Sequence, residues 1–348
     1  MWPSPRFLEQ TALFHTATDQ QLASGYVSHS TQRLTNRKYS GRLLISIHSF
    51  NSVMVYLSAV TLLWAFSFSL IGVYLAGQVD SWFAVWMRVA LASLVFIPFL
   101  RFKGVPRALI AKLMAIGGVQ LGLMYCFYYQ SFLLLSVPEV LLFTVFTPIY
   151  VTLIYDFLKG RFSPWYLVTA FIAVLGAVFI KFAGINEHFV TGFLVVQGAN
   201  LCFAIGQVGY KYVMEQESTE LPQHTVFGYF YLGALLVASV AFLLLGNPEK
   251  LPTTSVQWSI LVYLGLIASG LGYFAWNKGA CMVNAGALAI MNNALVPAGL
   301  VVNILIWNRE VDLVRLSLGG AIILGSLWIN ETWVKRRVER DYQRQGLL

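Results

Sequence analysis

A few polar side chains lie inside otherwise apolar stretches of this sequence, and their chemistry suits recognition of a small organic molecule. Arg88 is the clearest charge within such a stretch, and a guanidinium can hold a carboxylate through two parallel hydrogen bonds. Lys211 is a second candidate cation. Asn292 and Asn293 are adjacent amides, and because each both donates and accepts hydrogen bonds, the pair suits a neutral urea-like or amide group.

Each of these features also has a purely structural interpretation. Arg88 could bond the carbonyls of a neighbouring helix rather than a ligand. Asn292, Gly299 and Asn303 recur at intervals of seven and four and therefore share one helical face. Amides on such a face often form the interhelical hydrogen bonds that hold a membrane bundle together.

Glu139 is a candidate for coupling transport to protons, but its context also predicts a helix cap. The run Ser136-Val137-Pro138-Glu139 matches a capping box, in which the serine and the glutamate each bond the other's backbone. The two roles are compatible if this helix end opens into a cavity.

Aromatic and amide side chains at helical spacing could form the walls of a binding pocket. Equally, such a stripe is typical of ordinary packing. The candidate pocket residues, added to those above, are Trp64, Gln120, Tyr128, Tyr150 and Trp276.

These residues must be positioned by membrane-spanning helices. A hydrocarbon core of about 30 Å needs roughly 20 helical residues, and backbone groups in lipid are satisfied only in helices or closed barrels. Strand-type alternation does not occur, so we predict an all-α integral membrane protein. Its ten predicted spans are Val55–Ala76, Trp82–Leu100, Leu109–Ser131, Val137–Leu158, Trp165–Phe182, Thr191–Tyr212, Val226–Gly246, Val256–Trp276, Ala285–Trp307 and Leu316–Trp333.

Composition agrees with a chain whose partner is the lipid bilayer. Hydrophobic residues make up 58% and charged residues 11% of the 348, whereas about 25% is usual for charged residues in soluble domains. The net charge of +8 comes from short loops and the tail, so it indicates topology rather than nucleic-acid binding. Because the loops rich in Lys and Arg are cytoplasmic, both termini are predicted to lie in the cytoplasm.

The regions outside the spans predict a simple domain organisation. Residues 1–53 are polar, and we expect them to be disordered or to precede a native start at Met54. Residues 335–348 form a basic cytoplasmic tail. Three isolated cysteines without nearby histidines predict neither disulfides nor a metal site.

The ten spans divide into two halves, 54–183 and 191–334, that align with each other. The regions around Pro148 and Pro297 superpose without gaps, and Thr144 then meets Asn293. Since each half has an odd number of spans, the second enters the membrane inverted, which is typical of secondary carriers with a site near the midplane. The two prolines also remove backbone donors and should kink their helices.

At these residues the chain resembles the EamA type of the drug/metabolite transporter superfamily, which has ten helices in two five-helix halves. The resemblance rests on Trp64-Ala65, on Arg88 and on the Pro148 and Pro297 helices, with the family's acidic residue present as Glu310. It implies a central cavity lined by spans 3, 4, 8 and 9.

Within that family, several strings resemble the branch that carries biotin, over the whole membrane portion from about Met54 to Trp333. They are LLWAFSFS, LLFTVFTP, LIYD, FAIGQVGYK, WNKGA and IMNNALVPAGLVVN. The resemblance implies a secondary active transporter in a bacterial inner membrane, with biotin uptake as its function. An exporter of amino acids or related metabolites is the alternative. The sequence contains no Ser-His-Asp set, metal cluster or phosphate-binding loop, so we expect neither an enzyme nor a cofactor.

Overall fold

The computed structural model describes residues 56–158, 187–217, 221–283, 285–307 and 313–344, with isolated positions between 160 and 179. Within these residues every regular element is a helix and none is a strand. Most of the fifth predicted span and the whole of the polar segment 1–53 lie outside the described residues, so the interpretations placed on them remain predictions.

Among the described residues, seven helices are long and apolar enough to cross a bilayer: Tyr56–Leu75, Ser81–Phe99, Arg107–Leu134, Val137–Leu158, His188–Gln216, Gln223–Leu245 and Ser255–Met282. They correspond to predicted spans 1 to 4 and 6 to 8. Helix α12 (Ala285–Trp307) has the bounds predicted for the ninth span, and α13 (Leu313–Ile329) covers most of the tenth. The protein is therefore a multi-pass, all-helical membrane protein, and the count of ten spans stays a prediction.

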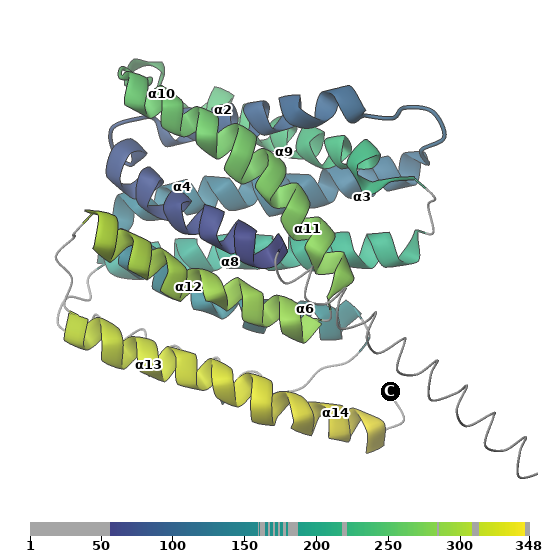
Figure 1. Ribbon diagram of the computed structural model, residues 1–348, viewed down its shortest axis with the longest axis vertical. Helices are drawn as coiled ribbons and strands as arrows, with labels where there is room; N and C mark the ends of the chain where they lie inside the picture. The colour runs from purple at the N-terminus through teal and green to yellow at the C-terminus, as the bar shows by residue number, and fades with distance from the viewer. Residues whose placement is uncertain are drawn as a thin grey trace, which may run out of the picture. The chain divides into compact units, whose positions relative to one another are not determined.

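Most crossings are assembled from more than one helical segment (Figure 1). The π-helical segments are wider than an α-helix, and the 3₁₀ segments are tighter. In chain order, the segments apart from α12 and α13 are η1 (Ile71–Leu75, π), α2 (Ser81–Phe96), η2 (Ile97–Phe99, 3₁₀), α3 (Arg107–Gly117), η3 (Gly118–Leu123, π), α4 (Met124–Leu134), α5 (Val137–Phe143), η4 (Thr144–Phe146, 3₁₀), α6 (Thr147–Leu158), α8 (Glu187–Gln216), α9 (Gln223–Leu245), η6 (Pro248–Lys250, 3₁₀), α10 (Ser255–Val262), η7 (Tyr263–Leu271, π), α11 (Gly272–Met282), η8 (Asn330–Val334, π) and α14 (Lys335–Arg344).

Local sequence explains where these helices begin. Asp80 caps α2, because its Oδ1 accepts from the backbone N–H of Phe83 at 2.7 Å. Thr254 and Gln257 form a capping box at the start of α10. Gly77, with φ of 75°, makes the turn between the first crossing and α2, a conformation that side chains with a Cβ rarely adopt.

The fourth crossing changes its helical form at Pro148, as expected from the missing backbone donor. Pro148 has no N–H with which to donate to the carbonyl of Thr144. The N–H of Thr147 donates to that carbonyl instead, which closes the 3₁₀ segment η4. The carbonyl of Phe143 is thereby freed. It accepts instead from Asn200 Nδ2 of α8 at 2.8 Å, so α8 satisfies the group that the proline displaces.

Helices α3 and α9 approach closely enough for their backbones to touch. A Cβ added to Gly117 in α3 would collide with the backbone of Phe230, and one added to Gly233 in α9 would collide with the backbone of Met114. Small residues allow this close helix packing in membranes. Helix α9 also packs on α2, and α8 packs on α4 and α6.

Replacing Gly117 by Ala should destabilise the protein, because the new methyl group meets backbone rather than a movable side chain. We expect a loss of about 1–3 kcal/mol, measured as a lower melting temperature with a dye that reacts with Cys126 and Cys202 as these buried thiols become exposed. The matched control is Gly320→Ala, because a Cβ there meets nothing within 4 Å. Equal melting temperatures for the two variants would contradict the close contact.

Candidate functional site

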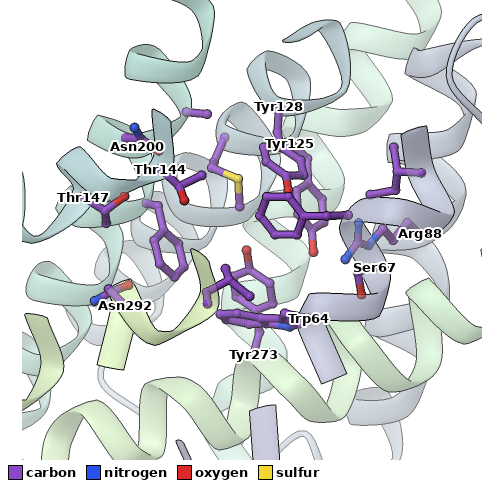
Figure 2. A pocket seen from close by; sticks show the side chains of 16 residues that line it. Trp64, Ser67, Arg88, Tyr125, Tyr128, Thr144, Thr147, Asn200, Tyr273 and Asn292 are labelled. Atoms are coloured by element: carbon purple, nitrogen blue, oxygen red, sulfur yellow. The ribbon is translucent and has the colours of Figure 1, made fainter. Parts of the chain in front are cut away.

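A cavity lies inside the helix bundle and holds about 590 Å³ of empty space, including the part open to the surroundings. It is lined by Trp64, Ser67, Phe68, Ile71, Arg88, Met124, Tyr125, Tyr128, Thr144, Thr147, Ala199, Asn200, Phe203, Tyr273, Asn292 and Leu295 (Figure 2). Crossings 3, 4, 8 and 9 all contribute, as expected, and the first, second and sixth crossings contribute as well.

Arg88 of α2 brings a positive charge to this cavity while only 3% of its surface is exposed. Its Nε donates to Ser269 Oγ at 2.5 Å and to the carbonyl of Leu264 at 3.2 Å. The guanidinium lies over the ring of Tyr125, 4.2 Å from the ring centre. Among the described residues, no carboxylate pairs with Arg88, and no group accepts a hydrogen bond from its Nη2. The arginine is thus held in place without being neutralised.

The π-helical segment η7 supplies the groups that hold Arg88. In a π-turn the backbone carbonyls are displaced from their usual partners, and several carbonyls of η7 accept from side chains instead. Leu264 accepts from Arg88, Ala268 accepts from Trp64 Nε1 at 2.9 Å, and Ser269 accepts from Tyr231 at 2.7 Å. This irregular segment therefore fixes both the cation and the aromatic wall of the cavity.

Aromatic rings form one wall between the two ends of the cavity. Trp64 lies 4.8 Å from Tyr273 and 5.0 Å from Trp276, measured between ring centres. Phe203 of α8 meets the edge of Trp64. Trp64, Tyr273 and Phe203 line the cavity, whereas Trp276 lies behind them. Aromatic walls of this kind suit an apolar ring system.

Hydroxyl and amide groups gather at the side of the cavity away from Arg88. Figure 2 shows Thr144, Thr147, Asn200 and Asn292 together, with Arg88 and Ser67 on the opposite side. Asn292 Nδ2 donates to Gln207 Oε1 at 3.3 Å and to the carbonyl of Leu288 at 2.9 Å. The cavity is therefore cationic at one end, neutral and hydrogen-bonding at the other, and aromatic between them.

The cavity brings together four of the nine residues predicted for the site: Trp64, Arg88, Tyr128 and Asn292. The hydroxyl of Tyr128 is buried without a partner among the described residues, so it is free to bond a ligand. The side chain of Asn293 lies outside the described set, and its role stays a prediction.

The other four predicted residues lie outside the lining. Gln120 is fully buried, packs against Gly206 of α8, and has no described hydrogen-bond partner. Tyr150 donates to Gln197 Oε1 at 3.2 Å, and Trp276 donates to Gln207 Oε1 at 3.1 Å. Glu139 forms the capping box, accepting from both the N–H and the hydroxyl of Ser136 at 2.9 Å.

Asn200, Thr147, Ser67, Ser269 and Tyr273 are site residues that the sequence reasoning missed. One signal was available for Asn200, because Gln197 and Asn200 are two amides three residues apart in an apolar stretch and so share a helix face. A lone serine or threonine in a span carries no comparable signal. Over the described residues, no group of His, Cys, Asp or Glu could hold a metal ion.

Comparison with known proteins places this cavity in a family. The model of the EamA-like transporter family matches residues 190–331. A protein of Pseudomonas aeruginosa named "Probable biotin transporter" is 55% identical over 277 residues, covering 80% of this chain and 97% of that protein. The chain belongs to the EamA-like transporter family. It is accordingly a transporter rather than an enzyme.

Two further relatives carry the name "Biotin transporter". The Salmonella typhimurium protein is 53% identical, and the Escherichia coli protein is 52% identical; each match covers 82% of this chain and 95% of the relative. A solved crystal structure also shares the fold, with a TM-score of 0.59 and 19% identity over 83% of this chain and 99% of that one.

If the cavity admits water, a cysteine placed in its wall should react with a charged methanethiosulfonate reagent. In a background with the three native cysteines replaced, we expect Thr144→Cys to react at least about tenfold faster than Thr152→Cys, measured by mass spectrometry. Thr144 lines the cavity, whereas Thr152 is buried on the same crossing outside it. Similar rates at both positions would show that the cavity is not the route of access.

Proposed function

We propose that this protein carries biotin across the inner membrane, in the direction of uptake, as a secondary transporter. The observation that carries the proposal is Arg88, a buried cation that faces the cavity with no described carboxylate beside it. A charge in a low-dielectric interior costs several kcal/mol unless it is paired. The substrate's own carboxylate is the partner that such a site favours, and biotin has one at the end of its valerate chain.

Lys211, the other candidate cation, is less suited to this role. Its Nζ already lies 2.9 Å from Glu215 Oε1 and donates to the carbonyls of Ala280 and Val283 at 3.3 and 3.0 Å. It is therefore neutralised within the protein and does not line the cavity. Arg88 has no comparable carboxylate among the described residues.

The ureido and thioether rings of biotin match the polar end and the aromatic wall of the cavity. Its ureido ring both donates and accepts hydrogen bonds, as do the side chains of Asn292, Asn200 and Thr147. The thioether ring beside the ureido group suits the aromatic wall at Trp64 and Tyr273. We therefore place the carboxylate at Arg88 and the ureido group at the amide end, which requires the ligand to extend across the cavity. The predicted roles of Asn293 and Gln120 belong to the same proposal.

Replacing Arg88 by Gln should weaken biotin selectively. Losing one partner of a buried ion pair costs about 3–5 kcal/mol, so we expect biotin affinity to fall at least about a hundredfold. Biotinamide, which carries no charge, should change less than about tenfold. Both are measured by binding to purified protein and by uptake into proteoliposomes, with and without an imposed pH gradient.

The control for this experiment is Arg107→Gln, which removes an exposed charge. Retained biotinamide binding by Arg88→Gln shows that the variant is folded. Equal losses of affinity for biotin and for biotinamide would show that Arg88 only holds η7 in place. Failure of well-expressed protein to rescue a biotin-requiring bacterium, together with efflux of an amino acid from loaded cells, would favour the exporter.

The proposal includes ten helices in two inverted halves, 54–183 and 191–334, with both termini cytoplasmic and the segments 1–53 and 335–348 outside the bundle. Two contacts support the assignment of these loops in pairs to a common side of the membrane. The N–H of Asp80 donates to the carbonyl of Lys250 at 2.7 Å, joining two loops assigned to the outer side. Lys112 pairs with Glu217 at 2.8 Å, joining two assigned to the cytoplasm.

Single cysteines at Gln78 and Asn247 should react with a membrane-impermeant reagent added outside intact cells, whereas a cysteine at Lys103 should react only after the membrane is opened. The reason is that the first two positions belong to the predicted outer loops and the third to a basic inner loop. Labelling is read by gel shift in a cysteine-free background. The reverse pattern would invert the topology.

A further inference from the structure

Helix α14 is highly charged, yet one of its sides is buried against the bundle. Val334, Val338 and Tyr342, spaced by four residues, form a buried cluster packed on Leu153, Trp165 and Ile329. The hydroxyl of Tyr342 also donates to Asp156 Oδ2 at 3.4 Å. Through η8, α14 continues the line of α13 (Figure 1). Residues 335–344 of the basic tail thus form a docked helix with a defined orientation.

The side of α14 next to the buried one carries three arginines around a hollow. Arg337, Arg340 and Arg344 follow one another at intervals of three and four, so they share a helix face. All three are exposed, and together with Asp341 of the same helix they border a space of about 370 Å³ that is partly open to the surroundings. Three guanidinium groups against one carboxylate leave this hollow with a net positive charge.

Two tryptophans indicate the depth of the hollow in the membrane. The guanidinium of Arg337 lies 4.6 Å from the ring centre of Trp165 and 5.8 Å from that of Trp333. Tryptophan at the end of a span prefers the headgroup region. A headgroup layer adds about 5–8 Å on each side of the hydrocarbon core. If α14 runs along the membrane normal, Arg340 lies about 4–5 Å and Arg344 about 10 Å beyond Arg337. Arg337 and Arg340 are therefore expected at headgroup depth, with Arg344 at the outer edge of that layer.

We propose that the hollow formed by Arg337, Arg340 and Arg344 binds the phosphate of an anionic phospholipid of the cytoplasmic leaflet. Guanidinium groups hold phosphate oxygens through paired hydrogen bonds, and basic clusters next to a span attract anionic headgroups. Charge, depth and a fixed helix orientation together favour a lipid over a soluble anion. The site is separate from the transport cavity and rests only on the proposed membrane placement of α13.

The test measures lipid bound to the full-length protein in neutral detergent by native mass spectrometry, after addition of equal amounts of phosphatidylglycerol and phosphatidylcholine. The natural sequence should retain phosphatidylglycerol preferentially. The triple variant Arg337→Gln, Arg340→Gln, Arg344→Gln should lose most of that preference, falling about tenfold. A double variant, Arg340→Gln with Arg344→Gln, keeps the Arg337 contact with the tryptophans and should show an intermediate loss.

The matched control is the triple variant Arg101→Gln, Lys103→Gln, Arg107→Gln, which removes the same charge from exposed positions of another loop. This control variant should keep the preference for phosphatidylglycerol. An equal loss of preference in the control would show that overall charge alone causes the effect, and it would overturn the proposal. Displacement of the lipid by millimolar inorganic phosphate would overturn it in favour of a soluble anion. Unchanged biotin binding by the α14 variants would separate this site from the transport function.

Discussion

Burial of one positive charge, that of Arg88, is the constraint around which the described core is arranged. A guanidinium inside an apolar bundle is stable only if its donors meet acceptors and its charge meets polarisable or negative groups. Leu264 and Ser269 supply the acceptors, and the face of Tyr125 supplies the negative side of an aromatic ring. Leu264 and Ser269 belong to the eighth crossing, Tyr125 to the third and Arg88 to the second, so the requirements of one side chain tie distant parts of the chain together.

Departures from regular α-helix are the means by which this bundle meets such requirements. In lipid a backbone carbonyl that leaves its helical partner must find another within the protein. Carbonyls of η7 accept hydrogen bonds from Arg88, Trp64 and Tyr231. The carbonyl of Phe143, released next to Pro148, accepts one from Asn200. Each irregular turn therefore becomes a fixed contact between crossings, and these contacts border the cavity.

The cavity and helix α14 accommodate positive side chains in different ways. Inside the bundle the cation is enclosed, and Arg88 lines a space with an aromatic wall and a neutral polar far end. At α14 the arginines are exposed and only their helix is anchored, through Val338 and Tyr342. An enclosed cation can select a ligand by its carboxylate, whereas exposed ones act on whatever anions the surface provides.

Sequence alone determined that the chain is an all-helical membrane protein, because a long apolar run carries its signal within itself. The bounds of α12 and the cap at Glu139 also followed from local patterns, and the family resemblance pointed to Arg88, which lines the cavity. Only the tertiary structure decided which polar residues share the cavity. Gln120, Tyr150 and Trp276 have the same types and spacing as lining residues, yet each turns toward a neighbouring helix. Asn200 is held by the displaced carbonyl of Phe143, and Ser269 is held by the side chains of Arg88 and Tyr125. Which way a side chain faces depends on the rotation of its helix against partners distant in the sequence, and no local pattern contains that information.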